Sequence, residues 1–151
     1  MNVSLKKYYA WFLLFYFLTT CVSGVLATIL PNSLAFVLMV FPYLIAMIGV
    51  LYIFLKQQRR APTKTERNRF SIFFNIIFWL FNLTGFFLGL FWASFSQPQI
   101  WQYTIGMLFQ PSTLFICALF FFVIAMPLYA VTFWFYGKQA QRMAIKMFGH
   151  I

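Results

Sequence analysis

Few side chains in this sequence could perform acid–base, nucleophilic or metal chemistry. The chain contains one acidic residue, Glu66, one histidine, His150, and two cysteines, Cys21 and Cys117, which both fall within apolar runs. A metal site needs several His, Cys or carboxylate ligands, and a nucleophile needs a base that a third group orients. We therefore expect no enzyme activity, no metal and no organic cofactor.

The single acid fits a structural role instead. Thr63 is followed three residues later by Glu66, and this pair at this spacing is typical of a capping box at the start of a helix. Arg67 and Arg69 follow the acid closely in the chain. We expect Glu66 to cap a helix that begins near Thr63.

The composition places the chain in a membrane. Of the 151 residues, 64% are hydrophobic and 8% are charged, whereas a soluble domain is about 45–50% apolar and about 25% charged. Four apolar runs are long enough to cross about 30 Å of hydrocarbon as helices. The sequence predicts an all-α fold, a single membrane domain over residues 1–151 with four transmembrane helices. Their approximate ranges are 8–30, 34–55, 70–95 and 112–136.

The basic residues indicate how these spans are oriented. All eleven lie before the first run, between the second and third, or after the fourth. Because basic residues favour the cytoplasmic side, we expect both termini and the loop of residues 56–69 in the cytoplasm. The short connection at residues 31–33 predicts a hairpin of the first two spans. Pro98, Trp101 and Tyr103 predict a short helix on the periplasmic surface between spans three and four.

The net charge of +10 predicts a partner of opposite charge. Nucleic acid is not expected, because the charges are few and lie close to apolar spans; anionic lipid headgroups fit better. The tail of residues 137–151 has basic residues at every fourth position, which is typical of an amphipathic helix on the inner membrane surface. The residues expected to contact anionic lipid are Lys56, Arg59, Arg60, Lys64, Arg67, Arg69, Lys138, Arg142 and Lys146.

The third span carries uncharged polar and small residues along nearly one face. Small residues let helix backbones approach closely, and amide side chains form hydrogen bonds across helices. We expect this stripe to pack within the subunit or against a second copy, in a homo-oligomer for which a trimer is favoured over a dimer. A polar pore lining is a third alternative. The stripe comprises Asn75, Asn82, Gly85, Gly89 and Ala93.

In its size, its aromatic-rich spans and its basic loop of residues 56–69, the chain resembles small uncharacterised four-span inner-membrane proteins of Gram-negative bacteria. The resemblance implies a multi-pass protein of the bacterial inner (cytoplasmic) membrane and implies no activity. Our hypothesis is a non-enzymatic, self-associating protein that organises or binds lipid and supports envelope integrity. The alternatives are a pore or transporter for small hydrophobic solutes, or an accessory subunit of a larger membrane complex.

Overall fold

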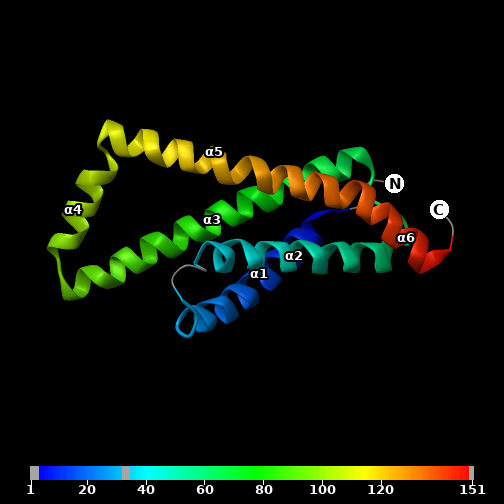
Figure 1. Ribbon diagram of the computed structural model, residues 1–151, viewed down its shortest axis with the longest axis horizontal. Helices are drawn as coiled ribbons and strands as arrows, with labels where there is room; N and C mark the ends of the chain where they lie inside the picture. The colour runs from blue at the N-terminus through cyan, green and yellow to red at the C-terminus, as the bar shows by residue number, and fades with distance from the viewer. Residues whose placement is uncertain (1–3, 32–34, 150–151) are drawn as a thin grey trace. The chain divides into compact units, whose positions relative to one another are not determined.

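The chain folds into helices that are joined by short connections (Figure 1). The computed structural model describes residues 4–31 and 35–149. Four helical stretches are long and apolar enough to cross a membrane, which confirms the prediction of a multi-pass α-helical protein. In chain order the elements are α1 (Lys6–Ala27), α2 (Ala35–Gln58), α3 (Lys64–Ser96), α4 (Gln99–Leu108), α5 (Pro111–Trp134), the π-helical turn η2 (Phe135–Gln139) and α6 (Ala140–Phe148).

The helix bounds differ from the expected spans at several ends. α1 ends at Ala27 and continues as a turn to Leu30, where Pro31 disfavours a further helical residue. α2 continues to Gln58, and Arg59 ends it with a φ of 49°. α3 begins at Lys64, ahead of its apolar run. A helix therefore does begin near Thr63, as the sequence predicts.

The first two helices form the expected antiparallel hairpin. The Tyr8 hydroxyl donates a hydrogen bond to Gln57 Oε1 (3.1 Å), and Thr19 Oγ1 lies 3.4 Å from the Pro42 carbonyl oxygen. Positions later in α1 thus pair with positions earlier in α2, and the hairpin prediction is confirmed. The predicted turn at residues 31–33 lies partly outside the described residues, and His150 lies wholly outside them.

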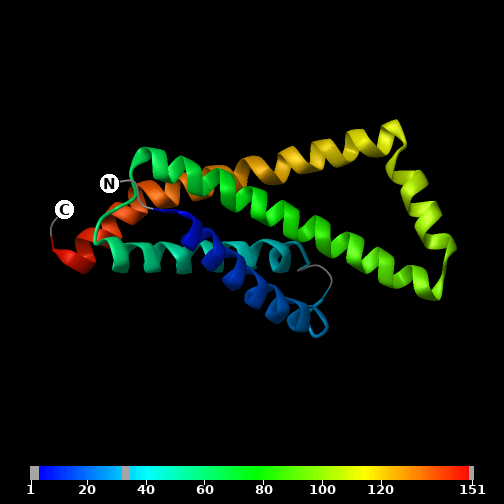
Figure 2. The same ribbon diagram turned by 180° about the vertical axis from the view of Figure 1, so that it is seen from behind.

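The contacts divide the chain into two units, with the boundaries inside α3 and α5. Unit 1 comprises residues 1–74 and 130–151, and unit 2 comprises residues 75–129. Unit 1 therefore contains α1, α2, the beginning of α3, the end of α5, η2 and α6. Unit 2 contains the remainder of α3 and α5, joined by α4 (Figure 2). The single membrane domain expected from the sequence stays a prediction.

Aromatic rings form the core of unit 1. Phe12 stacks on Phe74 with ring centroids 4.0 Å apart, and the centroids of Phe70 and Tyr136 are 5.0 Å apart. Lipid tails are as apolar as these rings, so the helices associate through close packing and hydrogen bonds. The fully buried aromatic side chains of unit 1 are Tyr8, Phe12, Tyr16, Tyr43, Phe54, Phe70, Phe74 and Tyr136.

Unit 2 buries far fewer side chains than unit 1. The ring of Trp79 packs on Phe121 with centroids 4.6 Å apart, whereas Trp92 is 78% exposed. An apolar surface of this kind suits a hydrocarbon environment, in which an exposed ring loses nothing to water. The buried hydrophobic residues of unit 2 are Phe78, Leu90, Ile124 and Leu128.

Candidate functional site

Contacts within unit 1 bring three separate basic segments of the chain to one end (Figures 1 and 2). Tyr8 ties the beginning of α1 to Gln57 near the end of α2, and α6 packs on α2. Arg60 binds Glu66 and so ties the end of α2 to the first turn of α3. We call this end the basic end. Its cationic residues are Lys6, Lys7, Lys56, Arg59, Arg60, Lys64, Arg67, Arg69, Lys138, Arg142 and Lys146.

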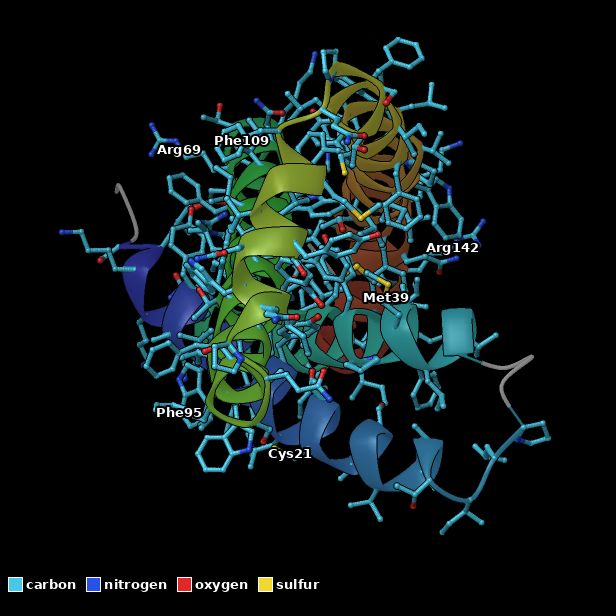
Figure 3. All side chains as sticks on the ribbon, turned by 90° about the vertical axis from the view of Figure 1, so that its left-hand side faces the viewer. Cys21, Met39, Arg69, Phe95, Phe109 and Arg142 are labelled. Atoms are coloured by element: carbon cyan, nitrogen blue, oxygen red, sulfur yellow. The ribbon has the colours of Figure 1, made fainter. Side chains whose placement is uncertain are left out.

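Most of these cations are exposed. Only Arg60 and Arg67 are half-buried, and the other nine side chains are exposed. Figure 3 shows the side chains of Arg69 and Arg142 extending away from their helices. Exposed ammonium and guanidinium groups remain hydrated and are free to approach the phosphates of a membrane surface.

Glu66 forms the capping box that the sequence predicts. The backbone N–H of Thr63 donates to Glu66 Oε2 (2.8 Å), and the backbone N–H of Glu66 donates to Thr63 Oγ1 (3.3 Å). The carboxylate also accepts two hydrogen bonds from Arg60, Nη1 to Oε2 at 2.8 Å and Nη2 to Oε1 at 2.7 Å. The ion-pair partner is thus Arg60 and not the sequence neighbours Arg67 and Arg69.

This pairing favours the charged form of both groups. The Arg60 hydrogen bond holds the pKa of Glu66 below its usual value, against a burial that raises it, and the Thr63 N–H lowers it further. The same bond raises the pKa of Arg60. Because the chain has a single acidic residue, no side-chain carboxylate remains to neutralise the other ten basic residues.

Arg67 packs against the protein instead of extending from it. Its Cζ atom lies 3.8 Å from the centroid of the Phe133 ring. The guanidinium also occupies the space in which a side chain at Gly137 would begin, so a Cβ there would overlap Arg67 Nη1 and lie 3.3 Å from Cζ. In the sequence, Arg67 is one of six basic residues in the loop of residues 56–69, with nothing local that sets it apart. The signal that was overlooked is Gly137, a glycine at the end of an apolar run.

The tail helix is amphipathic, as predicted, and part of its apolar face is used within the protein. Ala140 and Ala144 are fully buried, on the helix that packs on α2. Lys138, Arg142 and Lys146 are exposed. Small residues on one face of α6 let it lie close to α2, while the three basic side chains remain exposed on the surface.

The stripe on α3 lies in unit 2 and separates into two parts. Asn75 Nδ2 donates a hydrogen bond to the Ala125 carbonyl oxygen of α5 (2.8 Å), so this amide connects helices within the subunit. Asn82 Nδ2 donates to the Phe78 carbonyl oxygen of its own helix (2.7 Å). A Cβ at Gly85 or Gly89 would meet no described atom within 4 Å.

The inventory of metal ligands and thiols is short. In the described ranges 4–31 and 35–149, no three His, Cys, Asp or Glu side chains gather in a group that could hold a metal ion. Cys21 and Cys117 are exposed and free.

No protein-family model matches the chain, and neither does any curated protein or solved structure.

Replacing Glu66 with glutamine is expected to lower the free energy of unfolding by about 1 kcal/mol at neutral pH, because the cap and the Arg60 pair lose their charge. The folded-state pKa of Glu66 is lowered, so its ionised form stabilises the fold above the unfolded pKa of about 4.3. This contribution is lost as the pH falls through the folded pKa.

The measurement is the thermal unfolding of wild type and Glu66→Gln in detergent over a range of pH. The difference between them should be constant near neutrality and shrink below about pH 4. Lys64→Gln, which changes a charge at the same helix start, serves as the matched control. A difference that persists undiminished in acid would contradict the assigned role.

Proposed function

We propose that this chain is a non-enzymatic, self-associating protein of the bacterial inner membrane that binds and organises anionic lipid and so supports envelope integrity. The observation that carries this proposal is the basic end of unit 1. There eleven cations from three segments of the chain lie at one end, and the single side-chain carboxylate already binds Arg60. A surface of this charge needs external anions, and lipid phosphates are the anions next to an apolar helix end.

We propose a non-enzymatic function because the side chains best suited to catalysis serve structural roles. Glu66 is held by Arg60 and Thr63. Asn75 donates to a backbone carbonyl oxygen of α5. In the described part of the chain, no observation specifically favours the alternatives of a pore, a transporter for small hydrophobic solutes or an accessory subunit.

The proposed topology has both termini and the loop of residues 56–69 in the cytoplasm and α4 at the periplasmic surface. The basic segments support this arrangement through the positive-inside rule. The sequence of α4 carries no charge, and its Trp101 and Tyr103 side chains are exposed. Both residue types are enriched at the boundary between headgroups and hydrocarbon.

Self-association is supported by the open glycines of α3. Gly85 and Gly89 are exposed, with space beside them in the described structure. Ala93, four residues after Gly89, is half-buried. Glycines four residues apart let a second helix approach the backbone closely. We place the seam between copies at Asn82, Gly85, Gly89 and Ala93, with a trimer favoured over a dimer.

Reporter fusions test the topology. A reporter that is active only in the periplasm should be silent when it is fused after residue 60 and active when it is fused after residue 100. A reporter that is active only in the cytoplasm should give the opposite pattern, which controls for expression. Periplasmic activity at residue 60 would contradict the proposed orientation.

Lipid retention tests the proposed function. Protein purified gently from a bilayer that contains phosphatidylethanolamine and phosphatidylglycerol should be enriched in phosphatidylglycerol. The double variant Arg142→Gln, Lys146→Gln should lose much of this enrichment, since each charge near an anionic leaflet contributes about 1 kcal/mol.

The matched control for lipid retention is Gln141→Ala, which changes an exposed neutral side chain of α6 and should retain lipid as the wild type does. Cells that depend on the double variant should be more sensitive to detergent than cells with the control. Wild-type protein that retains the two lipids in the ratio supplied would overturn the proposal.

Replacing Gly89 with leucine tests the seam. The described structure offers open space at this position, so the subunit should fold normally, while the leucine side chain would hold two copies apart. Native mass spectrometry should show an oligomer for wild type and a shift toward monomer for the variant. Leu88→Phe, an enlargement at the adjacent exposed position, is the control. A monomeric wild type would remove the proposal of self-association.

A further inference from the structure

One cation of the basic end is held in a fixed position. The Arg67 guanidinium lies on the face of the Phe133 ring, with Cζ 3.8 Å from its centroid. On another side it meets the backbone at Gly137, where even a methyl group would overlap it. The Nε atom is buried and has no hydrogen-bond partner among the described residues. An arginine held in this way has already lost much of the side-chain freedom that an exposed arginine retains.

The backbone that holds Arg67 is itself anchored. Gly137 lies in η2, the π-helical turn that joins α5 to α6. Next to it, Tyr136 is fully buried, and its hydroxyl donates a hydrogen bond to the Met47 carbonyl oxygen of α2 (3.0 Å). π-Helical turns inside longer helices occur frequently at functional sites. The backbone behind Arg67 is therefore connected to α2 by a buried side chain and its hydrogen bond.

Arg67 lies at the polar end of the apolar run of α3, where the proposed membrane placement would put lipid headgroups. It precedes Phe70, the first fully buried residue of the apolar run, by one turn of helix. Lys64 lies one turn earlier on the same helix and is exposed, and residues three apart on a helix are neighbours on its surface. The carboxylate that could have neutralised Arg67 is bound by Arg60.

We infer that Arg67 forms a specific site for a phosphate group at the basic end, with Phe133 and Gly137 fixing its guanidinium and Lys64 adding charge. This inference rests on the proposed lipid-binding function and deepens it. Arg67 is half-buried and its Nε is buried, so its Nη groups are the donors left for phosphate oxygens, and the packing holds them in an orientation that a flexible lysine does not reproduce. The nine exposed cations attract anionic lipid without selecting a position.

The shared chemistry is a phosphate anion, and its expected source is the phosphodiester of an anionic phospholipid. The neighbouring apolar run of α3 offers surface for acyl chains next to the phosphate, and a soluble phosphate would not use that surface. Preorganisation of the receptor group increases affinity because less conformational freedom is lost on binding. Arg67 should therefore bind one lipid more tightly than its exposed neighbours do.

Native mass spectrometry of the full chain in a mild detergent tests the inference. Phosphatidylglycerol is titrated onto wild type, Arg67→Gln, Arg67→Lys and the matched control Arg69→Gln, which removes an exposed arginine from the same helix. The tightest-binding lipid should weaken about tenfold or more in Arg67→Gln. It should weaken less in Arg67→Lys and by under about twofold in Arg69→Gln.

A second variant keeps the test valid if Arg67→Gln folds poorly. Phe133→Leu retains every charge and removes only the aromatic surface under the guanidinium, so it should weaken the tightest lipid while leaving the net charge unchanged. Folding of each variant is checked by helical circular dichroism and gel filtration. Phosphatidylglycerol binding by a folded Phe133→Leu that equals wild-type binding would overturn the role of that surface in the site.

Two further arms identify the source of the phosphate and separate the two proposals. Inorganic phosphate and glycerol 3-phosphate are titrated by calorimetry: weak or undetectable binding supports a lipid, whereas Arg67-dependent binding of either compound overturns the lipid source. Equal weakening in Arg67→Gln and Arg69→Gln overturns the specific site and leaves the proposed function intact. A wild type that does not prefer phosphatidylglycerol over phosphatidylcholine overturns the proposed function itself.

Discussion

Ten basic side chains without a carboxylate partner cannot lie in the hydrocarbon of a bilayer, and this constraint determines where the helices of unit 1 meet water. α2 ends just before Arg59, whose positive φ turns the chain away from the helix. α3 then begins with a capping box whose glutamate binds Arg60. The loop between the two helices is therefore short and closed by one ion pair, and the chain reverses direction where the charge density is highest.

The same constraint limits what can hold the helices together. In an apolar solvent the hydrophobic effect offers little difference between a ring that faces lipid and a ring that faces another helix. Unit 1 relies instead on stacked and tilted rings and on tyrosine hydroxyls that find partners. Tyr43 shares a hydrogen bond of 2.7 Å with Thr132, and Tyr136 bonds to the Met47 carbonyl oxygen. Each bond joins α2 to the segment around η2, so that segment has a defined position beside the basic end.

The sequence alone predicted the parts of the fold that follow from local chemistry. Apolar runs predicted four spans, Thr63 and Glu66 predicted the start of α3, and Pro98 predicted a short helix that the structure has as α4. Which ring faces the core was not predictable, because aromatic and aliphatic residues occur all around each span. Tyr8 and Tyr9 are neighbours in the sequence, yet only Tyr8 is fully buried.

The features of the candidate site also fall into two groups, those that depend on local sequence and those that depend on tertiary contacts. The cations of the basic end were predicted as a set, because their charge and their positions beside apolar runs are visible in the sequence. The separate environment of Arg67 was not, since it depends on Phe133 and Gly137, which are distant in the chain. A π-helical turn has no compositional signature, and its glycine has meaning only once the opposing arginine is known.

The glycines of this chain differ in whether a neighbouring side chain covers their backbone. In unit 1, the Arg67 side chain occupies the space beside Gly137, and a Cβ at Gly49 would lie 3.2 Å from the Phe15 ring, so a neighbour covers these two glycines, whereas a Cβ at Gly24 of the same unit would meet no described atom within 4 Å. In unit 2, Gly85 and Gly89 have no such neighbour among the described residues. Flexible acyl chains fill such a groove poorly, because ordering them against a narrow surface costs entropy, whereas a second helix is already ordered. Under the proposed self-association, the open glycines of α3 are therefore the surface at which a second copy would have an advantage over lipid, and bulky exposed rings such as Phe86 and Trp92 would give it none.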